Sequence, residues 1–171
     1  MKSGSFANII SGYSSVKNIL IFLGLVMVFN GLLFPTFYTF RPDARPPDIL
    51  FFDNPETVYS ILGNYSAQER TDYLTGVILL DFIYPVVYSL LFSFVLFRLW
   101  NRVAPARLPL LILLADYAEN FGIILLLLAY PRQLIALAWL TLFFTTIKWI
   151  LVVVVLLVVT AGLGRKIFKR Q

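Results

Sequence analysis

The sequence contains no cysteine and no histidine, and only 13% of its 171 residues are charged. Without cysteine, disulfides, thiolate metal sites and thiol redox chemistry are excluded. Without histidine, histidine-ligated haem, the usual zinc sites and histidine-based catalytic triads are excluded as well. We therefore expect the chain to use neither a metal ion nor a cofactor.

The scarcity of charge also excludes the water-soluble classes of protein. Soluble domains carry about a quarter charged residues and about half apolar ones, whereas 60% of this chain is hydrophobic. A globule of this length cannot hide so much apolar surface from water. A soluble enzyme, a disordered chain and a nucleic-acid-binding module are excluded, despite a net charge of +5. The composition indicates an integral membrane protein.

Four apolar runs are long enough to cross a bilayer, which takes about 20 residues of helix. They cover residues 19–40, 74–97, 108–130 and 134–163. The last two runs are separated by a very short loop and must form an antiparallel hairpin. We predict an all-α polytopic membrane protein, with one transmembrane domain over residues 1–171 and four helices in an antiparallel bundle.

The distribution of lysine and arginine predicts the orientation of the chain in the bilayer. Nine of the 14 basic residues lie in the N-terminal segment, the loop after the second run and the C-terminal tail, and four lie in the other two loops. Cytoplasmic loops of membrane proteins carry the excess of positive charge. We therefore expect both termini to be cytoplasmic, and we expect the membrane to be the bacterial inner membrane.

Residues 41–73, between the first two runs, are predicted to form a small helical cap at the outer end of the bundle. They begin with a proline-rich connector, RPDARPPD. Asn54 followed by Pro55 is typical of a helix start, and Ser66 with Glu69 three residues later is typical of a capping box. The second of these helices is expected to continue into the second span. The cap either covers the bundle end alone or acts as a lid over a cavity or as a docking surface.

Four ionisable side chains lie inside the predicted spans, namely Asp81, Asp116, Glu119 and Lys148. A charged group at the centre of a membrane helix costs roughly 2.5–3.5 kcal/mol on insertion scales, so these groups must face one another, water or a ligand. The helical rise per residue places Lys148 at a depth close to that of Asp116 and Glu119, with Asp81 nearer the outer end.

Other polar residues accompany these charges at helical spacing, so that each span brings polar groups to one side of the bundle. Asn120 lies one turn after Asp116 on the third span, and Thr145 lies one turn before Lys148 on the fourth. The predicted polar core, which is also the candidate ligand site, consists of Asn30, Asp81, Tyr84, Tyr88, Asp116, Glu119, Asn120, Thr145 and Lys148.

The charges in this predicted core do not balance, because three carboxyls accompany one ammonium group. The carboxyl that pairs with Lys148 is left open by the sequence. A single buried ion pair with hydrogen-bonded neighbours would serve to fix how the helices pack. Surplus acids inside a membrane are typical of sites that act on ligands or protons.

Two motifs and one lysine occur in a set order within residues 54–148. The motifs are Asp-x-x-x-Pro-x-x-Tyr and Asp-x-x-Glu-Asn. Their members are Asp81, Pro85 and Tyr88, then Asp116, Glu119 and Asn120, followed by Lys148. In this order they resemble an uncharacterised family of small bacterial four-span membrane proteins. The resemblance implies the four-span fold and the shared polar core, and it implies no activity.

A looser similarity, of architecture alone, is to the emopamil-binding (EXPERA) membrane family. That family has four or five spans, an outer loop after the first span and an acidic ligand cavity near the middle of the membrane. The histidine that its isomerases use is absent from this chain. The similarity therefore implies a ligand cavity and does not imply sterol isomerisation.

These observations favour a non-enzymatic protein that binds a lipid-like ligand or serves as an accessory subunit of a membrane complex. The expected partners are the lipid bilayer, a hydrophobic small molecule, other membrane subunits or a second copy of the chain. One alternative is an intramembrane acid–base enzyme, isomerase-like, that uses Asp81, Asp116 or Glu119 on an apolar substrate. Another is a proton-coupled transporter, which four spans would form only as a dimer. No residue is assigned a catalytic role.

Overall fold

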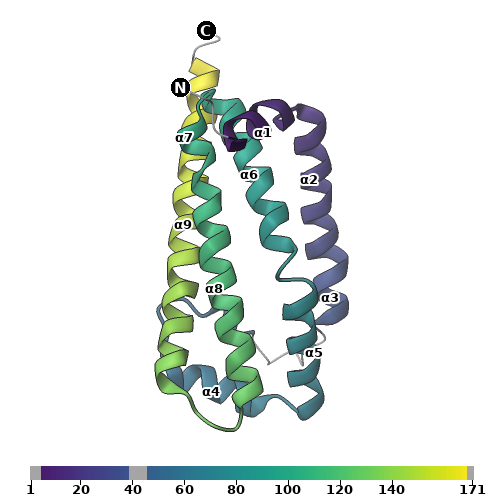
Figure 1. The fold of residues 1–171 in the computed structure, drawn as a ribbon, viewed down its shortest axis with the longest axis vertical. Helices are drawn as coiled ribbons and strands as arrows, with labels where there is room; N and C mark the ends of the chain where they lie inside the picture. The colour runs from purple at the N-terminus through teal and green to yellow at the C-terminus, as the bar shows by residue number, and fades with distance from the viewer. Residues whose placement is uncertain (1–4, 39–45, 169–171) are drawn as a thin grey trace.

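The computed structural model describes residues 5–38 and 46–168, and this part of the chain is helical and contains no strand (Figure 1). In chain order the elements are α1 (Ser5–Tyr13), α2 (Val16–Val28), the π-helical segment η1 (Phe29–Leu33), α3 (Phe34–Phe37), the 3₁₀ turn η2 (Pro47–Ile49), α4 (Pro55–Asn64), α5 (Ala67–Leu79), α6 (Tyr84–Trp100), α7 (Val103–Ala106), α8 (Leu108–Ala129) and α9 (Ile135–Phe168).

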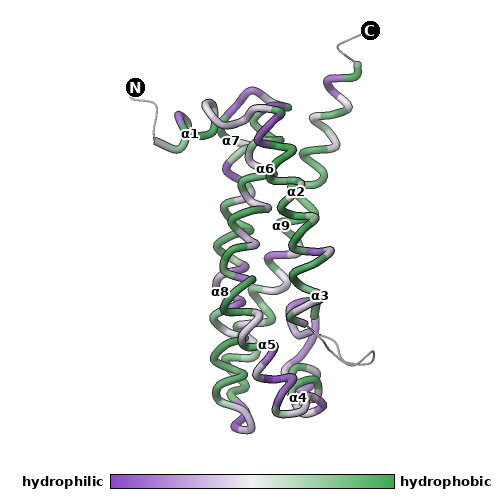
Figure 2. Tube along the Cα trace, turned by 90° about the vertical axis from the view of Figure 1, so that its right-hand side faces the viewer, coloured by the Kyte–Doolittle hydropathy of each residue, from purple (hydrophilic) through white to green (hydrophobic). Residues whose placement is uncertain are grey.

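Three helical stretches of the described chain are long and apolar enough to cross a membrane, namely Val16–Phe37, Val103–Ala129 and Ile135–Phe168. α5 and α6 meet the same criterion together, although they are bent by 42°. The outward surfaces of these helices are apolar, and Met27 and Leu114 are 67% and 64% exposed. Figure 2 shows hydrophobic residues along most of their length. Because so large an apolar surface is unstable in water, the chain is an integral membrane protein.

α8 and α9 pack side by side over much of their length (Figure 1). Gly122 of α8 lies directly against Thr141 of α9, and a Cβ atom at position 122 would overlap the Thr141 side chain. Small residues at such a contact allow two membrane helices to approach closely. The short connection predicted between the last two apolar runs is present at residues 130–134. The close α8–α9 contact brings the polar stripes of the two helices together.

α4 lies across the end of the long helices that is remote from α1 (Figure 1). The side chain of Asn54 accepts a hydrogen bond from the N–H of Thr57, at 3.0 Å, and Ser66 and Glu69 form a complete capping box. Both predicted helix starts are therefore confirmed. Residues 39–45, which hold most of the predicted connector and the end of the first apolar run, lie outside the described residues.

The helix opened by Ser66 runs on into the second predicted span, as expected, but it does not continue to the end of that span. α5 ends at Leu79, residues 80–83 form a turn, and α6 begins at Tyr84. The second predicted span, residues 74–97, is therefore divided into two helices that meet at an angle. The reason for this break lies in Pro85 and in the side chains of α8, and it bears directly on the candidate site.

Candidate functional site

The break between α5 and α6 leaves a main-chain carbonyl exposed to α8. Proline has no N–H, so Pro85 cannot donate to the carbonyl of Asp81, four residues earlier. The side-chain nitrogen of Asn120 donates to this carbonyl instead, at 2.7 Å. A buried carbonyl without a donor would cost free energy, and Asn120 removes that cost.

A second carbonyl at the break is satisfied in the same way. The N–H of Val86 donates to the carbonyl of Ile83, three residues earlier, and not to the carbonyl of Phe82, four residues earlier. The hydroxyl of Tyr117 on α8 donates to the Phe82 carbonyl at 2.7 Å. Broken membrane helices are tolerated where neighbouring side chains satisfy the freed backbone groups. α8 therefore stabilises the break at two successive residues.

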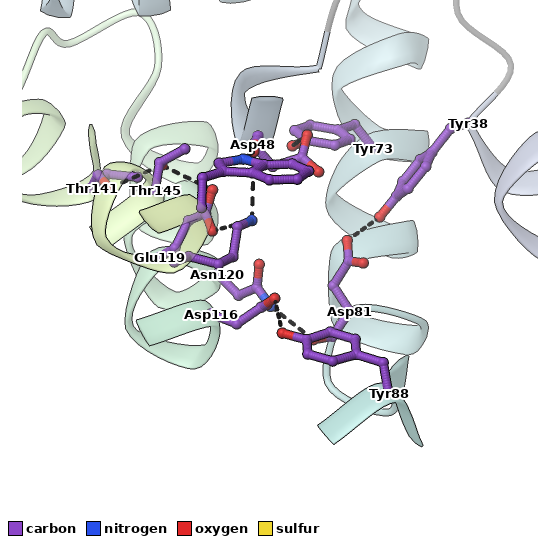
Figure 3. Close-up of polar contacts among 12 residues, drawn as sticks. Tyr38, Asp48, Tyr73, Asp81, Tyr88, Asp116, Glu119, Asn120, Thr141 and Thr145 are labelled. Carbon is purple, nitrogen blue, oxygen red and sulfur yellow. Dashed lines mark hydrogen bonds and ion pairs between the residues drawn. The ribbon is translucent and has the colours of Figure 1, made fainter. Parts of the chain in front are cut away.

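Asp116 of α8 accepts two hydrogen bonds that join it to α6 and to the break. The hydroxyl of Tyr88 donates to Oδ2 and the amide of Asn120 donates to Oδ1, both at 2.8 Å (Figure 3). Asn120 thus links the Asp116 carboxyl to the Asp81 carbonyl. The Asn120 amide therefore connects the Asp-x-x-x-Pro-x-x-Tyr motif, which begins at Asp81, with the Asp-x-x-Glu-Asn motif, to which Asn120 itself belongs.

The side chain of Asp81 points toward the first span. The hydroxyl of Tyr38, just after α3, donates to Oδ2 of Asp81 (Figure 3). At the first residue of α6, the hydroxyl of Tyr84 accepts a hydrogen bond from the amide of Asn30, at 2.8 Å. Asn30 lies in the π-helical segment η1, and such segments frequently occur at functional sites. Tyr38 was not among the predicted site residues.

Lys148 of α9 forms an ion pair with Glu119 of α8. The sequence left open which carboxyl pairs with Lys148, and in the structure it is that of Glu119. The Oε2 atom of Glu119 has no other hydrogen-bond partner among the described residues, and its Oε1 accepts from the Thr145 hydroxyl at 2.8 Å. Glu119 is fully buried, and Lys148 and Thr145 are buried as well. The predicted juxtaposition of these three side chains across α8 and α9 is confirmed.

The part of the cap that precedes α4 reaches the core and brings Asp48 to the same site. The main-chain carbonyl of Asp48 accepts hydrogen bonds from the indole nitrogen of Trp149 at 3.2 Å and from Nζ of Lys148 at 3.5 Å. Its carboxyl accepts from the hydroxyl of Tyr73 at 3.3 Å (Figure 3). Sequence reasoning placed Asp48 in an outer connector, and no local pattern indicates this long-range contact.

Trp149 belongs to the site although it is 38% exposed. The indole holds the 3₁₀ turn η2 through the Asp48 carbonyl and keeps one edge on the outer surface. Its neighbour Lys148 points inward to Glu119. One turn of α9 therefore contributes a buried charge and a half-exposed aromatic ring to the same site.

These side chains surround a cavity of about 600 Å³ between the first span, α6, α8 and α9. The carboxyls of Asp48, Asp81 and Asp116 and the amine of Lys148 line one part of it. Apolar side chains line the rest, namely Leu23, Val26, Phe34, Ile49, Leu91, Phe92 and Val152. Of the predicted site residues, Glu119 and Thr145 do not line the cavity and lie behind Lys148.

The cavity opens on the flank of the helices. Leu23 on α2 and Trp149 on α9 both line the cavity, and both are exposed on the outer surface, by 43% and 38%. A molecule in the cavity would therefore be in contact with the lipid-facing side of the protein. In the described residues there is no group of three or more acidic side chains arranged to hold a metal ion.

Comparison of the chain with family models, with curated proteins and with solved structures gives no match. The function is therefore inferred from the cavity and from the contacts of the residues that line it.

Proposed function

We propose that this protein is a four-span membrane protein that binds an amphiphilic ligand in the cavity. The four spans are α2 with α3, α5 with α6, α8, and α9, arranged as an antiparallel bundle, with the bent pair counted as one span. α1 and the C-terminal end of α9 lie at the same end of the molecule (Figure 1), which an even number of spans requires. This basic end is the cytoplasmic end in the proposal, and the membrane is the bacterial inner membrane.

The observation that carries the proposal is the unequal lining of the cavity. Three aspartates face it, whereas its one ammonium group already pairs with Glu119. Each aspartate accepts a tyrosine hydroxyl, from Tyr73, Tyr38 or Tyr88, but a carboxylate offers about four acceptor positions. The lining therefore favours a ligand whose head donates hydrogen bonds, such as an alkylammonium group or a cluster of hydroxyls.

The apolar part of the cavity supports an apolar tail on the same ligand. Leu23 and Val26 of α2 and Val152 of α9 extend from the acidic region toward the outer surface. Ligand sites typically have volumes of roughly 300–1,000 Å³ and combine apolar walls with a few polar groups. A cavity of about 600 Å³ with this lining is suited to a small lipid-like molecule that enters from the bilayer.

An intramembrane acid–base enzyme is the second candidate, and one observation favours it. The carboxyls of Asp81 and Asp116 both line the cavity, and Asn120 connects the two residues by hydrogen bonds. A carboxyl on each side of a bound substrate would allow proton addition and removal. The two candidates are separated by the fate of the ligand, because an enzyme returns a chemically changed molecule and a binding protein returns the same one. The resemblance to the small bacterial four-span family remains part of the proposal and lends weight to neither candidate.

The test compares two probes of equal chain length, dodecylamine and dodecanoate, on the protein in mild detergent. We expect dodecylamine to raise the melting temperature and dodecanoate to leave it unchanged. Val152→Trp fills the cavity and should abolish the shift, whereas the matched control Val153→Trp alters a side chain that is 54% exposed and outside the cavity lining. Equal shifts from both probes, or an unchanged response of Val152→Trp, would contradict the proposal.

A further inference from the structure

A second apolar hollow lies at the opposite end of the molecule from the cap, where α7 and the start of α8 meet the end of α9. This groove has a volume of about 520 Å³ and is lined by Trp100, Ala104, Pro105, Leu108, Leu157, Val158 and Ala161. It shares no lining residue with the acidic cavity. Leu157, on its wall, is 64% exposed, so the groove faces the lipid side of the protein.

Trp100 is fixed at the head of this groove by contacts with α9. Its indole nitrogen donates to the main-chain carbonyl of Val158 at 3.2 Å. The ring lies on Gly162, where a Cβ atom would come within 2.8 Å of the indole nitrogen. Tryptophan is enriched at the level of the lipid headgroups. We therefore expect Trp100 to lie at the level of the lipid headgroups.

Arg165 lies over the Trp100 ring, with its guanidinium carbon 5.5 Å from the ring centroid. Among the described residues it makes no hydrogen bond or ion pair, whereas its neighbour Lys166 donates to the Arg98 carbonyl at 2.8 Å and ties α9 to the end of α6. Arg165 is one turn beyond Ala161, at the upper edge of the groove. The Trp100 ring thus holds the charge of Arg165 beside the apolar groove. The guanidinium group donates to no acceptor among the described residues.

The charges around the groove are all of one sign. Arg98, Arg102, Arg107, Arg165 and Lys166 lie in the two segments that form it, and the sequence has no aspartate or glutamate in residues 82–115 or 120–171. Basic residues close to a membrane surface contribute about 1 kcal/mol each to the attraction of anionic lipid. A guanidinium also matches the geometry of a phosphate with two parallel hydrogen bonds.

We propose that this groove is a binding site for an anionic phospholipid, which is separate from the ligand cavity. One acyl chain lies against Leu157, Ala161 and the α7–α8 turn, and the phosphate is bound by Arg165 above the Trp100 ring. The site joins α9 to the α6–α8 connection, so a bound lipid stabilises the basic end of the molecule. This proposal stands whether or not the acidic cavity binds a ligand.

The experiment titrates delipidated protein in detergent with dioleoyl phosphatidylglycerol, dioleoyl phosphatidylcholine or inorganic phosphate, and measures binding by native mass spectrometry and by the melting temperature. We expect phosphatidylglycerol to bind and to raise the melting temperature, and the other two probes to do neither at equal concentration. Arg165→Gln should weaken phosphatidylglycerol binding about fivefold, the equivalent of one basic contact. The matched control Arg132→Gln, an exposed arginine in the loop between α8 and α9 at the other end, should bind as the wild type does.

A second pair of variants tests the acyl-chain groove without changing any charge. Ala161→Phe fills the groove and should weaken phosphatidylglycerol binding, whereas Leu163→Phe, 49% exposed and outside the groove, should leave it unchanged. Equal binding of phosphatidylcholine, equal loss in Arg165→Gln and Arg132→Gln, or full binding by Ala161→Phe would each overturn the proposal. A matching response to inorganic phosphate would reduce the site to a simple anion site and would overturn it too.

Discussion

The side-chain nitrogen of Asn120 lies 2.7 Å from the main-chain carbonyl oxygen of Asp81, at the break between α5 and α6. The carbonyl is available because Pro85, four residues later, has no N–H to donate to it. The same amide donates to Asp116 at 2.8 Å. The amide of Asn120 therefore joins the break to the carboxyl of Asp116 on α8.

Replacing Asn120 with leucine should destabilise the protein, because it removes both hydrogen bonds while roughly keeping the volume of the side chain. The Asp81 carbonyl would then lack a donor inside the membrane, and we expect a loss of about 1–2 kcal/mol in the free energy of unfolding. Unfolding by SDS in mixed micelles measures this loss. Tyr13→Phe, which changes an exposed tyrosine on α1, serves as the control and should be neutral.

Pro85→Ala restores an N–H that can bond to the Asp81 carbonyl. In the Asn120→Leu background we therefore expect Pro85→Ala to recover part of the lost stability, whereas in the wild type it should bring no gain. Residues that share one acceptor show coupling energies of about 0.5–3 kcal/mol in such a cycle. Strictly additive effects would mean that Asn120 and Pro85 act on different parts of the structure.

Gly122→Ala should loosen the contact between α8 and α9. The added Cβ atom would overlap the Thr141 side chain, and overpacking of a tight contact costs about 1–3 kcal/mol. Gly24→Ala is the matched control, since a Cβ atom at that position meets nothing within 4 Å. Alanine is the better helix former by about 1 kcal/mol, so the control should melt at the wild-type temperature or above. A loss in Gly24→Ala equal to that in Gly122→Ala would contradict this prediction.

Trp149→Phe should release the segment around Asp48 from α9. It removes the 3.2 Å hydrogen bond to the Asp48 carbonyl and keeps an aromatic ring at the surface. We expect faster amide hydrogen exchange in residues 48–50 and a loss of about 0.5–1 kcal/mol in stability. Trp139→Phe, on the same helix and 54% exposed, should change neither quantity. Equal exchange rates in the two variants would show that Trp149 does not hold this segment.

The features that could be predicted from the sequence are those set by local chemistry. The starts of α4 and α5 follow from Asn54 and Ser66, which satisfy N–H groups within the same turn. The approach of Glu119 to Lys148 follows from helical spacing and from the short loop between α8 and α9. In each case neighbouring residues along the chain decide the outcome.

The features that were missed depend on contacts between distant segments. Pro85 did carry a signal, because a proline inside a helical pattern ends or kinks the helix before it, but the donors of Tyr117 and Asn120 that stabilise the break belong to α8. Asp48 meets Trp149 about 100 positions along the chain. Neither periodicity nor capping encodes a meeting of this kind, so the acidic lining of the cavity could be predicted only in part.

The pairing of Lys148 with Glu119 leads to the last prediction, which separates the two acids of α8. Lys148→Met keeps most of the side-chain volume and leaves the fully buried Glu119 carboxyl without its cation. Removal of one partner of a buried ion pair costs about 3–5 kcal/mol. We expect a loss of this size in detergent, measured as the free energy of unfolding.

Lys148→Met combined with Glu119→Gln should recover most of this loss, because replacing a whole buried ion pair is often neutral. Lys148→Met combined with Asp116→Asn should recover nothing, since Asp116 is held by Tyr88 and Asn120 and makes no ion pair with a described residue. The side chain of Asp81 accepts a hydrogen bond only from Tyr38 among the described residues. Asp81→Asn should therefore be nearly neutral for stability and should reduce the shift caused by dodecylamine. If Asp116→Asn rescues Lys148→Met as well as Glu119→Gln does, the two acids share the cation and the cavity contains one fewer free carboxylate than the proposed ligand chemistry requires.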